Sequence, residues 1–306
     1  MSGTDGAGGA GAGGTGAGAT GAGLVPRERI AAAPISWGVC EVPGWGHQLT
    51  PERVLDELTG LGIGATEFGP AGFLPGPLLA QAGVTAVGGF VPVVLHEPGH
   101  DPLPGVRAAI DQFTAAGART LVLAAATGQD GYDSRPEVDA DGWRLLLARL
   151  DEISAIAAAA GVTAALHPHV GTVVEGPEEV VRVLNGSRIG LCLDTGHMLV
   201  GGTDPVAIAR QAASRVAHVH LKDVDRAAAT AVLEKRTDYT AAVTAGLYRP
   251  LGQGDLDLAG LIGALESAGY RGWYVMEQDT VLTAEPAAGE GPVRDVGRSL
   301  DWLAGR

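Results

Sequence analysis

The sequence predicts a single α/β domain, a (β/α)8 TIM barrel, over residues 26–306. Short apolar runs alternate eight times with longer stretches of helical period. The apolar runs are continuous rather than alternating, as expected of parallel strands that are buried on both faces. Barrels of this kind take about 250 residues as one unit, and the chain has 306 residues. These three observations together favour the barrel.

Two other α/β or repeat architectures fit the sequence less well. A dinucleotide-binding fold would place a Gly-x-Gly-x-x-Gly turn after the first strand, and no such turn is present there. A solenoid would repeat a side-chain motif at a fixed period, and none recurs. The barrel remains the most economical interpretation.

Residues 1–25 are predicted to form a disordered tail that precedes the barrel. They are almost entirely Gly, Ala, Thr and Ser, and such a segment has little apolar surface to bury against the entropy of ordering it. The glycines do not indicate a phosphate-binding loop, because no strand precedes them and no Lys-Ser/Thr follows.

Capping and turn residues mark the elements in the first half of the barrel. Thr50 followed by Pro51 is typical of the start of a helix, and Gly161 suits the end of a long Ala/Leu-rich helix. The strands predicted here are residues 30–37, 65–68, 89–95, 120–125 and 162–166. The helices are residues 51–61, 78–81, 103–116 and the long helix that ends before Gly161.

The second half continues the alternation, with one interruption. The predicted strands are residues 189–193, 216–221 and 273–276, and the predicted helices are residues 178–184, 205–215, 256–268 and 293–303. Residues 225–255 lack a clear periodic pattern and are predicted to form a long loop.

Charge and cysteine content exclude several classes of function. The formal net charge of −14 argues against binding to nucleic acid or to an anionic membrane surface. No apolar run approaches the roughly 20 residues that cross a bilayer, and no secretory signal is recognisable. Cys40 and Cys192 are the only cysteines, too few for a disulfide scaffold, so a reducing cytoplasm is the expected location.

Polar residues gather where the predicted strands end, which is where barrels of this type build their active sites. Six of the eight histidines lie at or just beyond strand ends, whereas His47 and His100 lie in loops. The residues at the strand ends are Glu67, His96, His167, His169, Asp194, His197, His220, Lys222 and Glu277.

Four of these residues, from the ends of four consecutive strands, form the predicted metal site: His167, Asp194, His220 and Glu277. Carboxylates and neutral imidazoles together suit a divalent ion such as Mn²⁺, Co²⁺ or Zn²⁺. Asp194 could instead only cap the following turn. His218 shares a strand face with His220 and is more readily an inner core residue than a ligand. A purely structural role for Glu277 is hard to explain, because an unpaired buried carboxylate costs free energy of folding.

Catalytic candidates lie beside this set. His169 and His197 are equally compatible with substrate contact and with loop hydrogen bonding. Lys222 could stabilise an oxyanion or form a Schiff base, and a solvated surface lysine is the equally weighted alternative. Glu277 is a further candidate as a general base.

The predicted substrate-binding residues are Glu67, His96 and Trp37. Glu67 either orients substrate or makes a buried hydrogen bond. Trp37 and Trp45 could wall the pocket near the barrel top, although single aromatic residues more often serve packing.

Five segments resemble the xylose isomerase-like barrels called sugar phosphate isomerase/epimerases, and within them the inosose dehydratase branch. The segments are LCLDTGHMLVGGTDP, VAHVHLKDV, ALHPHVGT, LGQGDLDL and GYRGWYVMEQD. DTGH alone indicates only the superfamily, whereas HPHxGT, DTGH and HVHLKD together are fairly specific to this branch. The resemblance extends from Ile30 to the end of the chain.

The resemblance implies a divalent metal held by a carboxylate, an Asp, a His and a carboxylate at the ends of strands five to eight. Asp194, His220 and Glu277 match the last three positions, whereas His167 stands where the epimerases have a glutamate. Two-base epimerisation therefore loses one carboxylate, and a one-sided reaction is favoured. The resemblance also implies Mn²⁺ or Co²⁺ as cofactor and, without a visible binding motif, glutathione.

The activity expected from the resemblance is dehydration of 2-keto-myo-inositol to a trihydroxycyclohexane-dione in myo-inositol catabolism. Glu277 or a nearby imidazole would be the base, and His169, His197 or Lys222 the acid. The substrate partner is thus a small polyol ketone, and a homo-oligomer is compatible with the sequence.

Three alternatives to this activity differ in class. An isomerase or epimerase of an inosose or ketose would use the same metal site. A DNA-repair endonuclease of the abasic-site type is disfavoured by the acidic charge. A non-catalytic sugar-binding barrel is disfavoured by the presence of all four candidate ligands.

Overall fold

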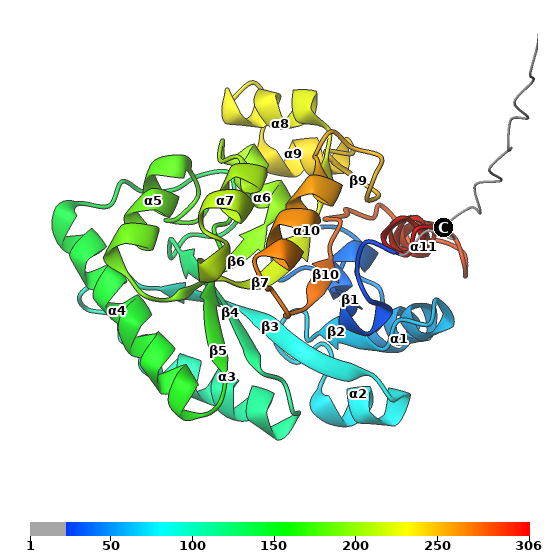
Figure 1. Cartoon of the computed structure of the whole chain (residues 1–306), viewed down its shortest axis with the longest axis horizontal. Coiled ribbons are helices and arrows are strands. Elements are labelled where there is room, and N and C mark those ends of the chain that lie inside the picture. Colours follow the sequence, from blue (N-terminus) through cyan, green and yellow to red (C-terminus); the bar gives the residue numbers. More distant parts are fainter. Residues whose placement is uncertain (1–22) are drawn as a thin grey trace, which may run out of the picture.

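Eight parallel strands close into a barrel in the computed structural model, which describes residues 23–306 (Figure 1). Around the barrel the hydrogen-bonded order is β1-β10-β7-β6-β5-β4-β3-β2. The barrel strands are β1 (Ile30–Ala32), β2 (Ala65–Glu67), β3 (Thr85–Val94), β4 (Thr120–Ala126), β5 (Thr163–Leu166), β6 (Gly190–Asp194), β7 (Val216–Leu221) and β10 (Tyr274–Met276). The predicted (β/α)8 barrel is therefore confirmed, and its strands lie close to the predicted ranges.

Helices cover the outside of this barrel (Figure 1). Their sequence signals act as predicted: the Thr50 hydroxyl accepts a hydrogen bond from the Arg53 N–H, and Gly161, after the long helix, has a φ of +71°. The covering helices are α1 (Pro51–Gly60), α2 (Gly76–Ala82), α3 (Leu103–Ala115), α4 (Ala140–Ala159), α5 (Pro177–Gly186), α7 (Pro205–Gln211), α10 (Leu258–Ser267) and α11 (Pro292–Leu303).

The hydrophobic core lies mainly between the strands and the helices. On β4, Leu121 and Leu123 belong to this outer core, while Val122 between them points into the barrel and packs with Ala165 and Cys192. Successive residues of a strand face opposite sides, so a continuous apolar run supplies both layers.

The prediction of a long structureless loop over residues 225–255 is wrong. This region holds α8 (Arg226–Leu233), α9 (Tyr239–Thr244) and β9 (Tyr248–Arg249), which pairs antiparallel with β8 (Asp223–Val224) just before the region. The helices are too short for a clear periodic pattern, and α8 starts from a local cap in which Asp225 accepts from the Ala228 N–H. In Figure 1 these elements lie together beyond one end of the barrel.

Three smaller differences concern the strand ends. The first strand stops at Ala32, and Pro34–Trp37 forms the 3₁₀ helix η2, because proline has no N–H with which to continue the ladder. A short helix, α6 (Thr195–Val200), follows β6 directly and was not predicted. The predicted helix over residues 205–215 ends at Gln211, and Ala213–Arg215 forms η3.

Of the predicted tail, residues 1–25, residues 1–22 lie outside the described residues. At the start of the described part, the Leu24 N–H donates to the Leu303 carbonyl at 2.8 Å, and Val25 is buried; η1 (Arg27–Arg29) then leads into β1. Within residues 23–306, no helix combines the length and the apolar character that crossing a membrane requires.

Candidate active site

The four predicted metal ligands meet at the carboxyl end of the barrel. Asp194 ends β6, His220 lies near the end of β7, and His167 and Glu277 directly follow β5 and β10. The His167 Nε2 lies 3.2 Å from the Asp194 Oδ2, and the His220 Nδ1 lies 3.5 Å from that same oxygen and 3.3 Å from the Glu277 Oε2. All four side chains are buried. One atom each of Asp194, His220 and Glu277 fall within 4.8 Å of one another.

Asp194 serves both the structure and the site. Its Oδ1 accepts hydrogen bonds from the backbone N–H groups of Gly196 at 2.9 Å and His197 at 2.7 Å, and so caps α6. Its Oδ2 faces His167 and His220. Capping therefore occupies one carboxylate oxygen and leaves the other for the site.

A buried carboxylate fixes the orientation of His220 from behind. The Oε1 of Glu67 lies 3.0 Å from the His220 Nε2 and 2.7 Å from the His218 Nε2. With Nε2–H donating to the shorter contact, the Glu67 carboxylate, the His220 Nδ1 is the atom left on the other side of the ring. Burial alone would raise the pKa of Glu67, but His220 and His218 outweigh it and keep Glu67 ionised.

This donor set fits a divalent metal ion. The buried His220 Nδ1 has no hydrogen-bond partner and faces two carboxylate oxygens. Three acceptors that converge in a buried place need a nearby cation or a second proton on the ring. The Lys222 ammonium lies 3.2 Å from the Asp194 Oδ2 and 3.0 Å from the Glu277 Oε2 and supplies part of this charge. Burial alone would lower the pKa of His220, yet the acidic groups around it, including Glu277 and Glu67, hold that pKa well above its usual value.

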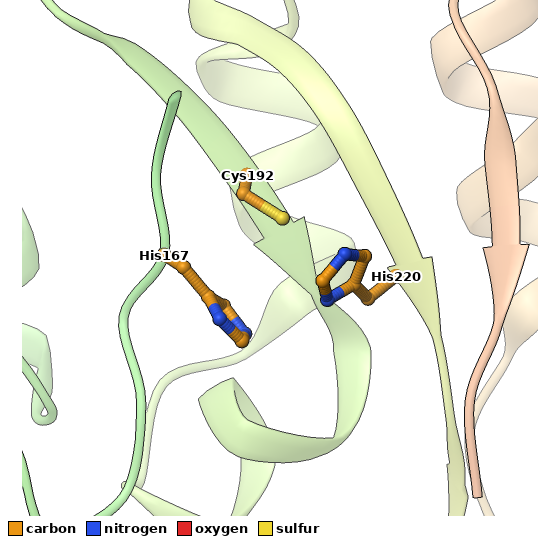
Figure 2. Close-up of side chains that lie close together, drawn as sticks. All are labelled: His167, Cys192 and His220. Atoms are coloured by element: carbon orange, nitrogen blue, oxygen red, sulfur yellow. The ribbon is translucent and has the colours of Figure 1, made fainter. Parts of the chain in front are cut away.

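Cys192 lies on the barrel-interior side of this set. Figure 2 shows His167, Cys192 and His220 directed toward a common space from the end of β5, from β6 and from β7. One ligand atom from each falls within 4.8 Å of the other two. Burial raises the pKa of the Cys192 thiol to about 11, so it is protonated at neutral pH.

Lys222 is buried among carboxylates rather than solvated. Its Nζ lies 2.7 Å from the Asp279 Oδ1, 3.0 Å from the Glu277 Oε2 and 3.2 Å from the Asp194 Oδ2. Burial alone would lower the pKa of Lys222, but these three carboxylates hold it well above its usual value. A Schiff base needs a neutral amine, so this environment favours a charge-stabilising role.

His169 and His197 stack against each other with ring centroids 3.6 Å apart. The His169 Nδ1 lies 2.7 Å from the Val170 carbonyl, so it carries the ring proton and leaves Nε2 as an acceptor. The His197 Nε2 lies 3.5 Å from the Asp279 Oδ2. Burial holds the pKa of both rings well below the usual value, and a nearby imidazole and Lys222 lower it further. That imidazole is His167 for His169 and His169 for His197.

A cavity of about 440 Å³ opens beside these groups. Of the predicted site residues it is lined by Glu67, His167, His169, His220, Lys222 and Glu277. Trp45 and Tyr132 also line it, and the Tyr132 hydroxyl donates to the Glu41 carboxylate, which links the β1–α1 and β4–α4 segments.

Two predicted substrate-binding residues lie elsewhere. Trp37 is fully buried in the core, where its Nε1–H donates to the Glu57 carboxylate at 3.0 Å. The His96 Nε2 lies 3.9 Å from the Glu97 Oε1. Neither residue lines the cavity.

Sequence reasoning missed three polar residues of the site. Asp279 accepts a hydrogen bond from the Tyr239 hydroxyl at 2.6 Å, and that hydroxyl lies 3.1 Å from the Tyr248 hydroxyl. Asp279 follows Glu277 by two residues, which is a usable signal because alternate residues of an extended segment share a face. Both tyrosines come from the region predicted as a loop and gave no signal.

Comparisons with known proteins place the chain in a family. The family model described as xylose isomerase-like TIM barrel matches residues 79–305. An inosose dehydratase of Geobacillus kaustophilus is 30% identical over 269 residues, which cover 82% of this chain and 87% of that protein. The rhizopine catabolism protein MocC of Rhizobium meliloti is 32% identical over 266 residues, with 82% and 81% covered.

Solved structures share the fold at lower identity. A structure of the IolI protein with a bound zinc atom matches with a TM-score of 0.66 and 15% identity, over 90% of this chain and 98% of that one. L-ribulose 3-epimerase matches with a TM-score of 0.65 and 17% identity, over 90% and 93%.

Proposed function

Because the chain belongs to the xylose isomerase-like TIM barrel family, we propose that it is a divalent-metal-dependent hydro-lyase. Its substrate is a polyol ketone, 2-keto-myo-inositol, which it dehydrates to a trihydroxycyclohexane-dione in the breakdown of myo-inositol. Relatives named inosose dehydratase support a dehydratase, and the L-ribulose 3-epimerase fold keeps a sugar isomerase or epimerase as the second candidate.

The observation that carries the proposal is the convergence of the Asp194 Oδ2, the His220 Nδ1 and the Glu277 Oε2, with His167 beside them. These four residues would hold the metal, with Mn²⁺ or Co²⁺ as the proposed ions. When bound, a divalent ion supplies positive charge that polarises the ketone and stabilises the negative charge developing on its oxygen.

His169 is the proposed general base. Its Nδ1–H is committed to the Val170 carbonyl, so its Nε2 can accept a proton, and the residue lines the cavity. The Glu277 Oε2 is less free, because it lies 3.0 Å from the Lys222 ammonium. His169 would take the proton on the carbon next to the ketone.

Lys222 is proposed to act at the departing hydroxyl group. Its ammonium lines the cavity and is held by Asp279 and Glu277. As the carbon–oxygen bond breaks, the ammonium would stabilise the negative charge on the departing oxygen. The hydroxyl leaves as water with the proton that His169 took from carbon, and the enol that remains becomes the dione by moving its hydroxyl proton to carbon. His197, stacked on His169, would position that base.

His167 is the reason to favour dehydration over epimerisation as the activity. Epimerisation by two bases needs an acceptor on each face of the sugar. Here one of the two positions carries an imidazole that lies 3.2 Å from Asp194.

The test is a product assay on full-length protein, stripped of metal and then reloaded with Mn²⁺ or Co²⁺. With 2-keto-myo-inositol we expect metal-dependent appearance of dione absorbance. Recovery of an epimeric inosose without dione would favour the second candidate, and no conversion with any divalent ion would refute the proposal. The same preparations are kept under reducing conditions, because both cysteines are free thiols and a cytoplasmic setting is part of the proposal.

A further inference from the structure

The two ends of the cavity differ in chemistry. One end carries the imidazoles, Lys222 and Glu277 described above. The other end, which we call the apolar chamber, lies between the segment after β2, the strand β3 and the helix α3. It is defined by Phe68, Gly89, Gly105, Ala108, Ala109 and Phe113.

The apolar chamber exists because two neighbouring strands differ in length. β2 ends at Glu67, whose register partner on β3 is Gly88, whereas β3 continues to Val94. Residues 89–94 therefore have no β2 partner. Residues 89–92 line the cavity, together with residues of the polar end and of α3.

Small residues keep the chamber clear. Gly105, Ala108 and Ala109 are spaced so that they share one side of α3, and all three line the cavity. Gly105 and Ala108 are exposed, so the chamber is open to solvent on the α3 side. Phe68 and Phe113 stack with ring centroids 4.9 Å apart at an angle of 22°. A Cβ on Gly89 would lie 2.9 Å from Phe113 and 3.1 Å from Phe68, so glycine is needed for this stack.

A bare cyclic polyol does not match both ends. Hydroxyl groups placed in the chamber would exchange water for apolar side chains and lose hydrogen bonds. Gln112 is the one polar side chain among the residues of α3 that line the cavity. The ring hydroxyls therefore fit the polar end, and the chamber fits something apolar.

We propose that the preferred substrate is a cyclic polyol ketone that carries an apolar alkyl or aryl substituent, and that the chamber binds this substituent. This inference rests on the proposed function, because the polar end is taken to hold the ketone. A cavity of about 440 Å³ is in the range that encloses a ligand larger than a single polyol ring.

The experiment compares 2-keto-myo-inositol with its positional mono-O-benzyl ethers, using the metal-loaded full-length protein. Burying an aryl group should lower KM about tenfold or more for the best ether relative to the unsubstituted ketone. Ala108→Leu fills the chamber and should raise KM for that ether about tenfold. Ala115→Leu is the matched control, since Ala115 is an exposed alanine of the same helix that does not line the cavity.

Direct binding separates this inference from the proposed function. Calorimetry with a mono-O-benzyl inositol, which has no ketone, reports on the chamber without turnover. Binding that Ala108→Leu weakens and Ala115→Leu does not would support the chamber even if neither ketone is dehydrated. Dehydration of the unsubstituted ketone, with no benzyl ether either bound or turned over more favourably, would overturn the inference and leave the proposed function standing.

Discussion

At the amino end of the barrel Arg215 and Arg29 each have several hydrogen-bond partners, whereas at the carboxyl end several buried polar atoms have none. Arg215, just before β7, donates to the carbonyls of Leu184, Ser187 and Ile189 at 2.7–2.8 Å. Arg29, just before β1, binds Glu266 and two carbonyls.

The carboxyl end is different. Three buried carboxylates, Asp194, Glu277 and Asp279, share the Lys222 ammonium, and a fourth, Glu67, faces His218 and His220. Among the described residues, every buried side-chain nitrogen or oxygen without a hydrogen-bond partner belongs to a residue on this side of the barrel, including atoms of His167, His197 and His220.

This difference indicates that the amino end of the barrel serves stability and the carboxyl end serves chemistry. Buried polar groups are normally hydrogen-bonded, and an unpaired one costs about 1–3 kcal/mol. Such costs persist where a ligand or a reaction uses the free atom. We therefore expect substitutions at the carboxyl end to change metal and substrate binding, and substitutions at the amino end to change stability alone.

His220→Ala should have the largest effect. It removes the central ligand. Loss of a residue that only hydrogen-bonds to a metal ligand lowers metal affinity roughly 10–100-fold, so loss of the ligand itself should lower it by well over that. Chelator competition and metal analysis of the purified protein measure this. His47→Ala, at a histidine in a loop away from the site, is the control. Stoichiometric metal retained by His220→Ala would show that this imidazole is not a ligand.

Lys222→Met should destabilise the metal-free protein by about 3–5 kcal/mol, because it leaves buried carboxylates without their cation. Added Mn²⁺ or Co²⁺ should recover part of this loss, since a divalent ion supplies the missing charge and binds only the folded state. Urea unfolding with and without metal gives both numbers. Equal stability of variant and wild type in the absence of metal would contradict the role assigned to Lys222.

Arg215→Met tests the other end of the barrel. Losing hydrogen bonds from a charged donor to three carbonyls should cost about 1–3 kcal/mol. Metal affinity and KM should stay at wild-type values, because Arg215 lies at the opposite end of β7 from His220. A change in metal affinity at unchanged fold would break the proposed division between the two ends.

The smallest expected effect is that of Asp151→Asn, also at the amino end. Burial alone would raise the pKa of Asp151, but the Arg188 N–H and the Ser187 hydroxyl donate to it and hold the pKa below its usual value. A lowered folded-state pKa stabilises the protein above the unfolded pKa, and this contribution is lost as pH falls through the folded value.

Asp151 is only partly buried, so this contribution should be below about 1 kcal/mol. Unfolding free energies measured near pH 7 and at a pH below the folded-state pKa of Asp151 should differ between variant and wild type only at the higher pH. A difference of equal size at both pH values would show that charge is not its source.

The barrel and most of its site could be predicted because the signals are local. Asp194, His220 and Glu277 stand at the ends of apolar runs, and the fold brings such ends together whatever the loops do. The helix cap at Thr50 could likewise be predicted, because it depends only on neighbouring residues of the sequence.

The remainder depends on contacts between distant segments. Whether Glu67 supports His220 or binds substrate depends on a contact across 153 positions of the sequence. Tyr239 and Tyr248 come from short helical and ribbon segments that fold against the barrel, so no pattern in their own sequence points to Asp279. Trp37 appears near a strand end in the sequence, but the turn at Pro34 carries it into the core.

The two oxygens of Asp194 have a consequence for how this barrel could change over generations. One oxygen starts α6 and the other faces the site. Asp194→Asn would keep an oxygen that can accept the capping hydrogen bonds and remove the negative charge. A lineage could therefore lose its chemistry in one step and keep a well-folded barrel, free to be recruited as a binding protein.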